Sequence, residues 1–276
     1  MQALDRVAFV RFDLRGNVRA LIRSCLGRKE VGAEEVPPEE VLPAGRPALF
    51  LHIPKTAGTS IVEIAAPYYP GGFVSHGDYH GHPPKDFEQI PFISGHFGYS
   101  YAQPLMRGRV SFTFLREPRE RVLSYYYFCR TRDPEEWRVY ALAQQLTLEG
   151  FLRRAQVDAH VKSAIWNGQV WQLAHGWANL DQRNITQWQP EELLELAVRH
   201  LDEFDHVGLT ETFASDRDII LDLLEVPRPE TAVAANRTDG RPMLGNLEAE
   251  AQELLTELTE LDQALYDEVR ARRATS

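Results

Sequence analysis

The sequence predicts an α/β fold built around a central parallel sheet. Short apolar runs at 48–53, 91–97, 109–115 and 205–211 have the length and composition of buried strands. Helical patterns separate most of these runs, and such alternation of strands with helices is typical of a parallel sheet. The chain has 276 residues, of which 43% are hydrophobic, so it is long enough to bury a large core.

Helices are expected between and after these strands. The segment SIVEIAA (60–66) begins a helix that Pro67 ends, and a second helix follows Pro118. Further helical patterns cover 147–156, 158–176, 190–204, 213–225 and 247–273. Residues 67–90 are rich in Gly, Pro and His without any periodicity, so we expect them to be irregular, and 226–245 read as a loop.

The first 46 residues differ from the remainder of the chain. Arginines recur every four residues within 1–29, at Arg11, Arg15, Arg19 and Arg23. With apolar residues between them, they predict an amphipathic helix that has a basic face. Such a helix would dock on a membrane surface or a protein partner, or would pack as a solvated helix on the domain. Residues 30–47 are rich in Pro and Glu and predict a linker, so we divide the chain into a 1–46 segment and a domain over 47–276.

Composition excludes several classes of protein. The two cysteines, Cys25 and Cys129, are far apart in the sequence, so neither a disulfide framework nor a cysteine zinc site is expected. No apolar run is long enough to span a bilayer, and Asp5, Arg6 and Arg11 interrupt the segment where a secretory signal would lie. We therefore expect a cytoplasmic protein.

Charge is distributed unevenly along the chain. The formal net charge is −10, with −13 on residues 189–276 and +3 on residues 1–188. An anionic ligand is therefore expected to meet the first two thirds of the chain. A protein that binds nucleic acid through its general charge would be basic, so that class is excluded.

The segment FLHIPKTAGTS (50–60) places a tight loop between a strand and a helix. The first turn of a helix carries unpaired N–H groups and a partial positive charge, both of which favour an anion. Lys55 adds a charge, and Gly58 would let the backbone approach a ligand. Hydroxyl groups that can donate to phosphate-like oxygens follow at Thr56, Thr59 and Ser60. The sequence thus predicts an anion site in this loop.

The spacing of this loop argues against a magnesium–nucleotide site. It differs from G-x-x-x-x-G-K-[ST], because Lys55 precedes Gly58, and no apolar strand ends in an evident Mg²⁺-holding aspartate. A P-loop kinase or nucleotide hydrolase therefore ranks as an alternative. A second alternative is a catalytically silent binding module docked through residues 1–29.

At this loop the sequence resembles a known family. HIPKTAGTS is similar to the 5′-phosphosulfate loop of sulfotransferases that use 3′-phosphoadenosine 5′-phosphosulfate (PAPS), above all sulfotransferase family 2, which contains Golgi carbohydrate sulfotransferases and bacterial relatives. FTFLREPRERVLSYYYF (112–128) resembles the second signature, especially that of uronosyl 2-O-sulfotransferases, and VGLTE (207–211) is a third match. The resemblance covers about 48–245 and implies a P-loop-like three-layer α/β/α domain.

The resemblance also implies roles for individual residues. The phosphosulfate loop comprises Pro54, Lys55, Thr56, Ala57, Gly58, Thr59 and Ser60. Lys55 would neutralise the phosphate oxygen that leaves, while Arg116 and Ser124 would hold the 3′-phosphate. The loop ANRTDGRPM (235–243) lies where the family covers the nucleotide, so Arg237 and Thr238 are candidates there unless that loop is merely solvated.

A histidine is the expected base because it titrates near neutrality. In ISGHFGYSYAQP (93–104), the family's glycine–histidine pair corresponds to His96, whose alternative role is a histidine satisfied in the core. The rival bases are His80 and His82 in YHGH (79–82), although these lie about a dozen residues out of place. A metal reading would group His76, Asp78, His80 and His82, whereas the resemblance implies no metal.

The resemblance implies a hydroxylated acceptor such as a carbohydrate or a glycolipid, with a small hydroxylated metabolite as an alternative. The acidic balance of the chain argues against a heavily sulfated polyanion. The segment NGQVWQLAHG (167–176) has Trp171 where the family often has arginine, and an aromatic platform there would suit a sugar ring. Tyr125–Phe128 form an aromatic run, one face of which is expected to reach the cleft. The sequence does not specify an oligomeric state.

Overall fold

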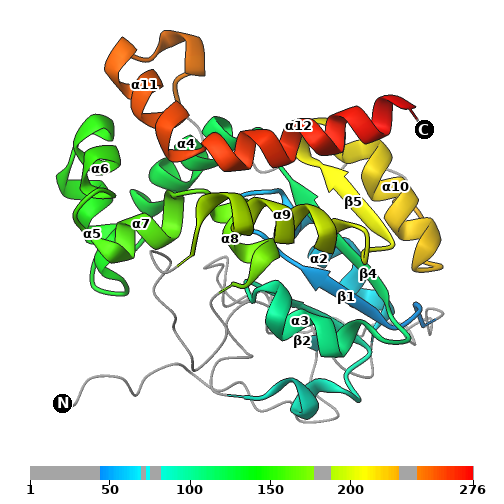
Figure 1. Ribbon diagram of the computed structural model, residues 1–276. Coiled ribbons are helices and arrows are strands. Elements are labelled where there is room, and N and C mark those ends of the chain that lie inside the picture. Colours follow the sequence, from blue (N-terminus) through cyan, green and yellow to red (C-terminus); the bar gives the residue numbers. More distant parts are fainter. Residues whose placement is uncertain (1–43, 70–72, 75–81, 177–187, 230–240, 276) are drawn as a thin grey trace.

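A computed structural model describes residues 44–69, 73–74, 82–176, 188–229 and 241–275 (Figure 1). Several predictions fall outside these ranges: the basic helix of 1–29, the candidates His76, Asp78 and His80, and the pair Arg237 and Thr238. In the described part of the chain, no helix is both long and apolar enough to cross a membrane.

The core of the fold is a parallel sheet with the strand order β2-β3-β1-β4-β5. Its strands are β1 (Ala48–Leu51), β2 (Phe73–Val74), β3 (Phe92–Gly95), β4 (Val110–Leu115) and β5 (His206–Leu209). All four predicted strands are confirmed, and each is slightly shorter than expected. The irregular reading of 67–90 was wrong at β2, since two residues are too few to carry an alternating pattern.

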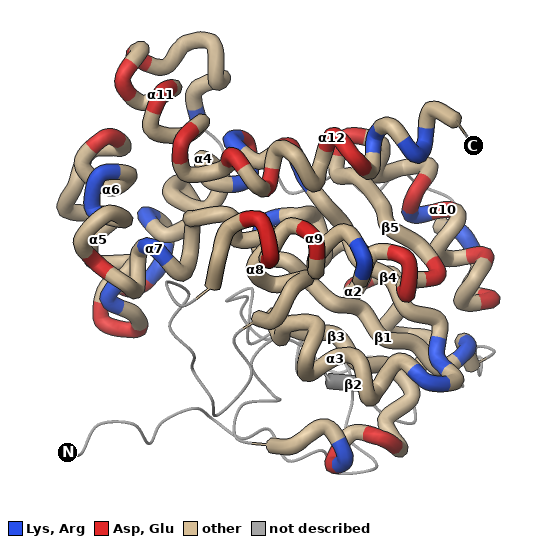
Figure 2. The backbone as a smooth tube through the Cα atoms, in the orientation of Figure 1, with Lys and Arg blue, Asp and Glu red and all other residues tan. Residues whose placement is uncertain are grey.

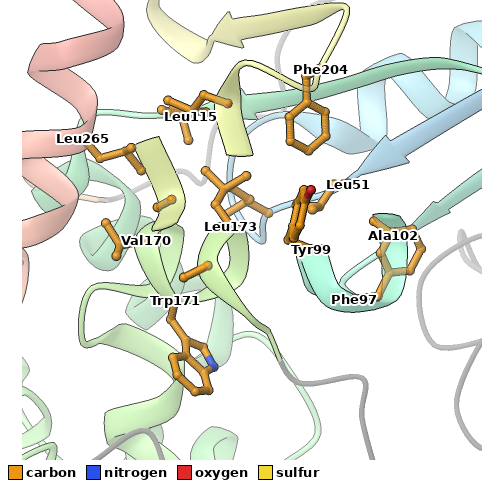
Figure 3. Close-up of a cluster of buried hydrophobic side chains, with 14 of the residues drawn as sticks. Leu51, Phe97, Tyr99, Ala102, Leu115, Val170, Trp171, Leu173, Phe204 and Leu265 are labelled. Atoms are coloured by element: carbon orange, nitrogen blue, oxygen red, sulfur yellow. The ribbon is translucent and has the colours of Figure 1, made fainter. Parts of the chain in front are cut away.

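Helices cover both faces of this sheet, which confirms the predicted three-layer architecture. Leu49 and Leu51 of β1 face α3 (Tyr99–Met106), α8 (Gly168–Ala174), α9 (Pro190–Leu201) and α12 (Glu260–Thr275). Ala48 and Phe50 face α2 (Gly58–Ala65) and α10 (Phe213–Leu223) on the other side. Burial on both faces explains why the strands read as continuous apolar runs. Figure 3 shows part of the first of these clusters.

A third apolar cluster lies beside the sheet. It joins α4 (Pro118–Cys129), α5 (Arg138–Gln145), α6 (Leu148–Arg154), α7 (Ala159–Ile165) and α11 (Ala249–Leu258). Short 3₁₀ turns complete the described elements at Ala66–Tyr68, Pro84–Phe87, Thr210–Thr212 and Leu244–Asn246. The helices α3 and α5 were not predicted. Pro104 lies inside α3 and weakens the sequence signal for a helix there.

Two helices that we predicted as continuous are each broken in the structure. The segment 158–176 divides into α7 and α8 at Asn167, whose φ of 43° is left-handed. The segment 247–273 divides into α11 and α12 at Thr259. The breaks meet, because Asn167 N donates to Leu258 O at 2.9 Å and Asn167 Oδ1 accepts from the N–H groups of Leu261 and Asp262. Tertiary hydrogen bonds therefore override a helical pattern that continues through both positions.

Candidate functional site

The candidate site is built at the carboxyl edge of the sheet. Leu51, Gly95 and Thr113 lie in register on β1, β3 and β4, so the segments after β1 and β3 begin side by side, and β4 runs on to Leu115. His52 and the loop to α2 follow β1, His96 follows β3, and Arg116 follows β4. Ligands of open parallel sheets bind at this edge, where the strand order reverses around the first strand.

The loop between β1 and α2 has an unusual backbone. Lys55 and Ala57 both have positive φ, at 72° and 64°, although neither is glycine. Such conformations are sparsely populated in residues that carry a Cβ, and they tend to cluster where a ligand is bound. Between them, buried Thr56 donates from Oγ1 to Ile53 O at 2.8 Å, so its hydroxyl proton is used to fix the loop.

The start of α2 is open to an anion. Ala57 occupies the N-cap position and has no side-chain oxygen that could satisfy the first N–H groups of the helix. Ser60 is buried in the first turn, while Thr59 is exposed. The first turn therefore presents backbone donors and the exposed Thr59 hydroxyl, while the hydroxyls of Thr56 and Ser60, which were also predicted to face the anion, are buried.

Gly58 is required by a neighbouring side chain. A Cβ at this position would lie 2.2 Å from both Cδ2 and Nε2 of His52. The buried His52 ring stacks on Phe50, with ring centroids 5.0 Å apart. The approach of a ligand to Gly58 stays a prediction, and the structure adds a contact of this position with the His52 imidazole.

Four cationic side chains gather around the loop. Lys55 Nζ lies 4.1 Å from the centroid of the Phe128 ring, and Arg132 Cζ lies 4.4 Å from the same centroid. Burial, together with the charges of Arg116, Arg132 and Arg241, lowers the pKa of Lys55 to about 8. The three guanidinium groups contribute because they place further positive charge around the ammonium group. An anion bound there would relieve the repulsion.

Arg116 is attached to the loop that carries Lys55. Its Nη1 donates to Lys55 O at 3.1 Å, and its Nη2 lies 3.5 Å from Glu120 Oε2. Glu120 is shared, because Arg241 pairs with its carboxylate and donates from Nη1 to its carbonyl oxygen at 3.0 Å. Burial lowers the pKa of the Arg116 guanidinium. Arg116 and Lys55, which are 61 residues apart in the sequence, are thus brought together as predicted.

Ser124 lies on α4, the helix that begins just after Arg116. Its side chain is buried, and in the described residues no hydrogen bond links it to Arg116 or to Lys55. The same helix ends with the predicted aromatic run, in which Tyr125 and Tyr126 are buried. Phe128 is the member of this run that reaches the cationic cluster.

His96 is held at the end of β3. Its ring centroid lies 4.7 Å from that of His52, with the planes inclined at 58°. The neighbouring carbonyl oxygens are both bonded: Gly95 O accepts from His52 N at 3.0 Å, and Phe97 O accepts from Gln172 Nε2 at 2.8 Å. The backbone on each side of His96 is therefore fixed to the end of β1 or to α8.

A comparison with known families identifies the type of protein. The family model described as "Sulfotransferase family" matches residues 46–267. The chain belongs to the sulfotransferase family. A search of curated proteins finds no match. Membership makes the protein a sulfotransferase and supports sulfuryl transfer over the kinase or hydrolase alternative.

Two cationic residues of this sulfotransferase were missed by the sequence analysis. Arg132 follows the second signature by four residues, and Arg241 lies in the 235–243 loop from which Arg237 and Thr238 were chosen. Arg241 comes from the acidic last third of the chain, so the charge balance of a segment did not reveal it. Figure 2 shows how acidic residues line α9, α11 and α12.

The structure changes the expectation for Trp171 and gives the surroundings of His82. Trp171 is 4% exposed and belongs to the apolar cluster of α8, so the expectation of an exposed platform for a sugar was wrong (Figure 3). Its sequence position next to polar residues did not reveal that all of α8 is buried. His82, a rival base, has Nδ1 3.4 Å from Oδ2 of Asp86, which lies in the 3₁₀ turn Pro84–Phe87.

No group of three or more His, Cys, Asp or Glu side chains that could hold a metal is found among the described residues. The proposed ligands His76, Asp78 and His80 lie outside them.

We expect Gly58→Ala to destabilise the protein, because the new methyl group would displace the His52 ring. Overpacking of this kind costs roughly 1–3 kcal/mol in the free energy of unfolding. Urea denaturation measures this change. Gly245→Ala is the matched control, since a Cβ at Gly245 meets nothing within 4 Å. Equal denaturation midpoints for the two variants would contradict the assigned role of Gly58.

Proposed function

We propose that this sulfotransferase transfers a sulfuryl group from PAPS to a hydroxyl group of a carbohydrate or another alcohol. The observation that carries the proposal is the cluster of Lys55, Arg116, Arg132 and Arg241 around the open start of α2. PAPS and its product, 3′,5′-adenosine bisphosphate, carry anionic groups at two ends of one nucleoside. The donor set fits them, because lysine, arginine and backbone N–H groups all donate to phosphate oxygens.

The two ends of the donor are assigned to two parts of the cluster. The loop 54–60, with Lys55 at its centre, binds the 5′-phosphosulfate. Arg116 and Ser124 bind the 3′-phosphate, as the resemblance to family 2 implies. Arg132 and Arg241 add positive charge around Lys55. Arg237 and Thr238, which lie outside the described residues, remain proposed contacts with the nucleotide on the strength of the resemblance.

The reaction requires a group that accepts a proton and one that neutralises the leaving oxygen. We assign the first role to His96, which takes the proton of the acceptor hydroxyl as its oxygen forms a bond to sulfur. Lys55 neutralises the phosphate oxygen as the bond between that oxygen and sulfur breaks. The sulfuryl group thereby moves to the acceptor, and adenosine bisphosphate remains. The loop and Arg116 hold the donor in line for this attack.

We propose a class of acceptor, a cellular location and a docking segment for the enzyme. A hydroxylated glycan or glycolipid agrees with the resemblance, and a small hydroxylated metabolite would use the same chemistry. A cytoplasmic location is proposed from the cysteine content. Docking through residues 1–29 stays a prediction, because that segment lies outside the described residues.

The donor assignment is tested by binding of 3′,5′-adenosine bisphosphate in calorimetry. Loss of a charge-assisted hydrogen bond costs about 1.5–3 kcal/mol, so Arg116→Met should weaken binding by roughly 10- to 150-fold. Arg109→Met is the matched control, since Arg109 adjoins the other end of β4 and donates to the carbonyl oxygens of Ile90 and Glu88. If the unaltered protein ignores this nucleotide, the donor proposal is wrong.

Binding of the same nucleotide should weaken as the pH rises above about 8. The lowered pKa of Lys55 means that the free protein loses this proton near pH 8, whereas the bound anion requires it. The dissociation constant should then rise by up to about tenfold per pH unit. Calorimetry between pH 7 and about pH 10 measures this slope. Lys55→Met should remove it, and Lys162→Met, which alters a lysine over the Trp166 ring, should retain it.

The base is tested with ³⁵S-labelled PAPS and a panel of hydroxylated acceptors. With an acceptor found in this way, His96→Ala should lower kcat by about 10²–10⁴ and leave adenosine bisphosphate binding unchanged. His82→Ala and His80→Ala, the variants of the rival bases, should retain turnover. Full turnover by His96→Ala would remove this assignment while leaving the donor site intact.

A further inference from the structure

Two glutamines of α8 lie against the strand ends that carry the candidate site. Gln169 and Gln172 are one helical turn apart, and both are fully buried. Buried amides are costly unless they are hydrogen-bonded. Both side chains bond the backbone just beyond a strand, and each does so beside a different member of the candidate machinery.

Gln169 is bonded to Arg116. Its Oε1 accepts from Arg116 N at 2.9 Å, and its Nε2 donates to Arg116 O at 3.0 Å. The side-chain amide thus satisfies both backbone groups of the first residue after β4, as a neighbouring strand would. This fixes the direction in which the Arg116 side chain leaves the backbone to reach Lys55 O.

Gln172 is bonded to the segments that follow β1 and β3, the second of which carries His96. Its Nε2 donates to His52 O at 3.1 Å and to Phe97 O at 2.8 Å. His52 N in turn donates to Gly95 O at 3.0 Å. The residues before and after His96 are therefore tied to His52, directly at Gly95 and through Gln172 at Phe97.

The helix that carries the two glutamines is itself fixed. Asp262 accepts from Gln169 N at 3.2 Å and from Val170 N at 2.8 Å. Asp262 is fully buried and lies 3.8 Å from Nη2 of the equally buried Arg121. A Cβ at Gly168 would lie 2.6 Å from that nitrogen, so α8 is packed directly on the ion pair. The amides are thus mounted on a rigid support.

We propose that Gln169 and Gln172 are positioning residues with separate targets. Gln169 orients Arg116 toward the donor phosphate, and Gln172 orients His96 toward the acceptor hydroxyl. The inference rests on the proposed function for the meaning of these targets. It adds that one short helix sets nucleotide binding and proton transfer independently. Each glutamine then serves as the control for the other.

The test compares Gln169→Met with Gln172→Met in the full chain. Both variants keep the length of the side chain and lose the amide, so a merely structural role predicts similar effects from each. Calorimetry gives the dissociation constant of 3′,5′-adenosine bisphosphate. NMR gives the ring resonance of His96, assigned with His96→Asn, and thermal unfolding checks that each variant folds.

Misplacement of a binding group by about 1 Å can cost as much as a hundredfold. We therefore expect Gln169→Met to weaken nucleotide binding by about ten- to a hundredfold while the His96 resonance stays in place. Gln172→Met should shift the His96 resonance and keep the dissociation constant of the nucleotide within about twofold of that of the unaltered protein. Equal losses of binding in both variants, or unchanged values in both, would overturn the inference.

Failure of the donor proposal gives a different result. The unaltered protein would then show no nucleotide binding at all. In that case the Nε–H resonance of Arg116, assigned with Arg116→Met, replaces the dissociation constant. It should move in Gln169→Met and stay in place in Gln172→Met, and the opposite pattern would overturn the positioning roles.

Discussion

The buried carboxylate of Asp262 is the constraint on which the site depends. Burial raises the pKa of Asp262 and lowers that of its partner Arg121, because each charge has lost its water. The two N–H groups at the start of α8 and the guanidinium together stabilise the ionised carboxylate. Removing one partner of such a pair usually costs 3–5 kcal/mol, since the other charge stays buried and uncompensated. This pair holds α4, α8 and α12 together beneath the cationic cluster.

The cationic cluster itself is a region of electrostatic repulsion that neighbouring groups offset only in part. Lys55, Arg116, Arg132 and Arg241 come from the loop after β1, the end of β4, the segment after α4 and the loop before α11. Each is expensive to bring near the others in a partly buried setting. Three interactions offset part of this repulsion: Lys55 lies over the Phe128 ring, Arg241 pairs with the Glu120 carboxylate, and Arg116 donates to the carbonyl oxygen of Lys55. A doubly anionic ligand is the natural complement of this arrangement.

The sheet and the loop between β1 and α2 could be predicted because their signals are local. A short apolar run is enough to indicate a buried strand. The loop after β1 is indicated by its glycine, lysine and hydroxyl residues between a strand pattern and a helix pattern. Arg132 and Arg241 could not be predicted, since their position depends on the path of α4 and of a distant loop. The breaks at Asn167 and Thr259 were hidden for a similar reason: the helical period runs on through both. Gly58 was predicted to let the backbone approach a ligand, but its close contact with the His52 ring, which follows β1, was not predicted.

The hydrogen bonds between the two helix breaks, at Asn167 and Thr259, affect the order in which a newly made chain can fold. Asn167 bonds Leu261 and Asp262 across about 94 positions of sequence, so these contacts close a very long loop. On a ribosome the strands emerge well before α12 does. Until it arrives, α8 lacks the carboxylate that receives its first N–H groups, and Arg121 would have to be buried without its partner. Long-range closure of this kind slows folding and leaves apolar surface open to aggregation in the meantime. Docking of the last helix is therefore the step that completes the edge with the candidate site, long after the residues of that edge have been synthesised.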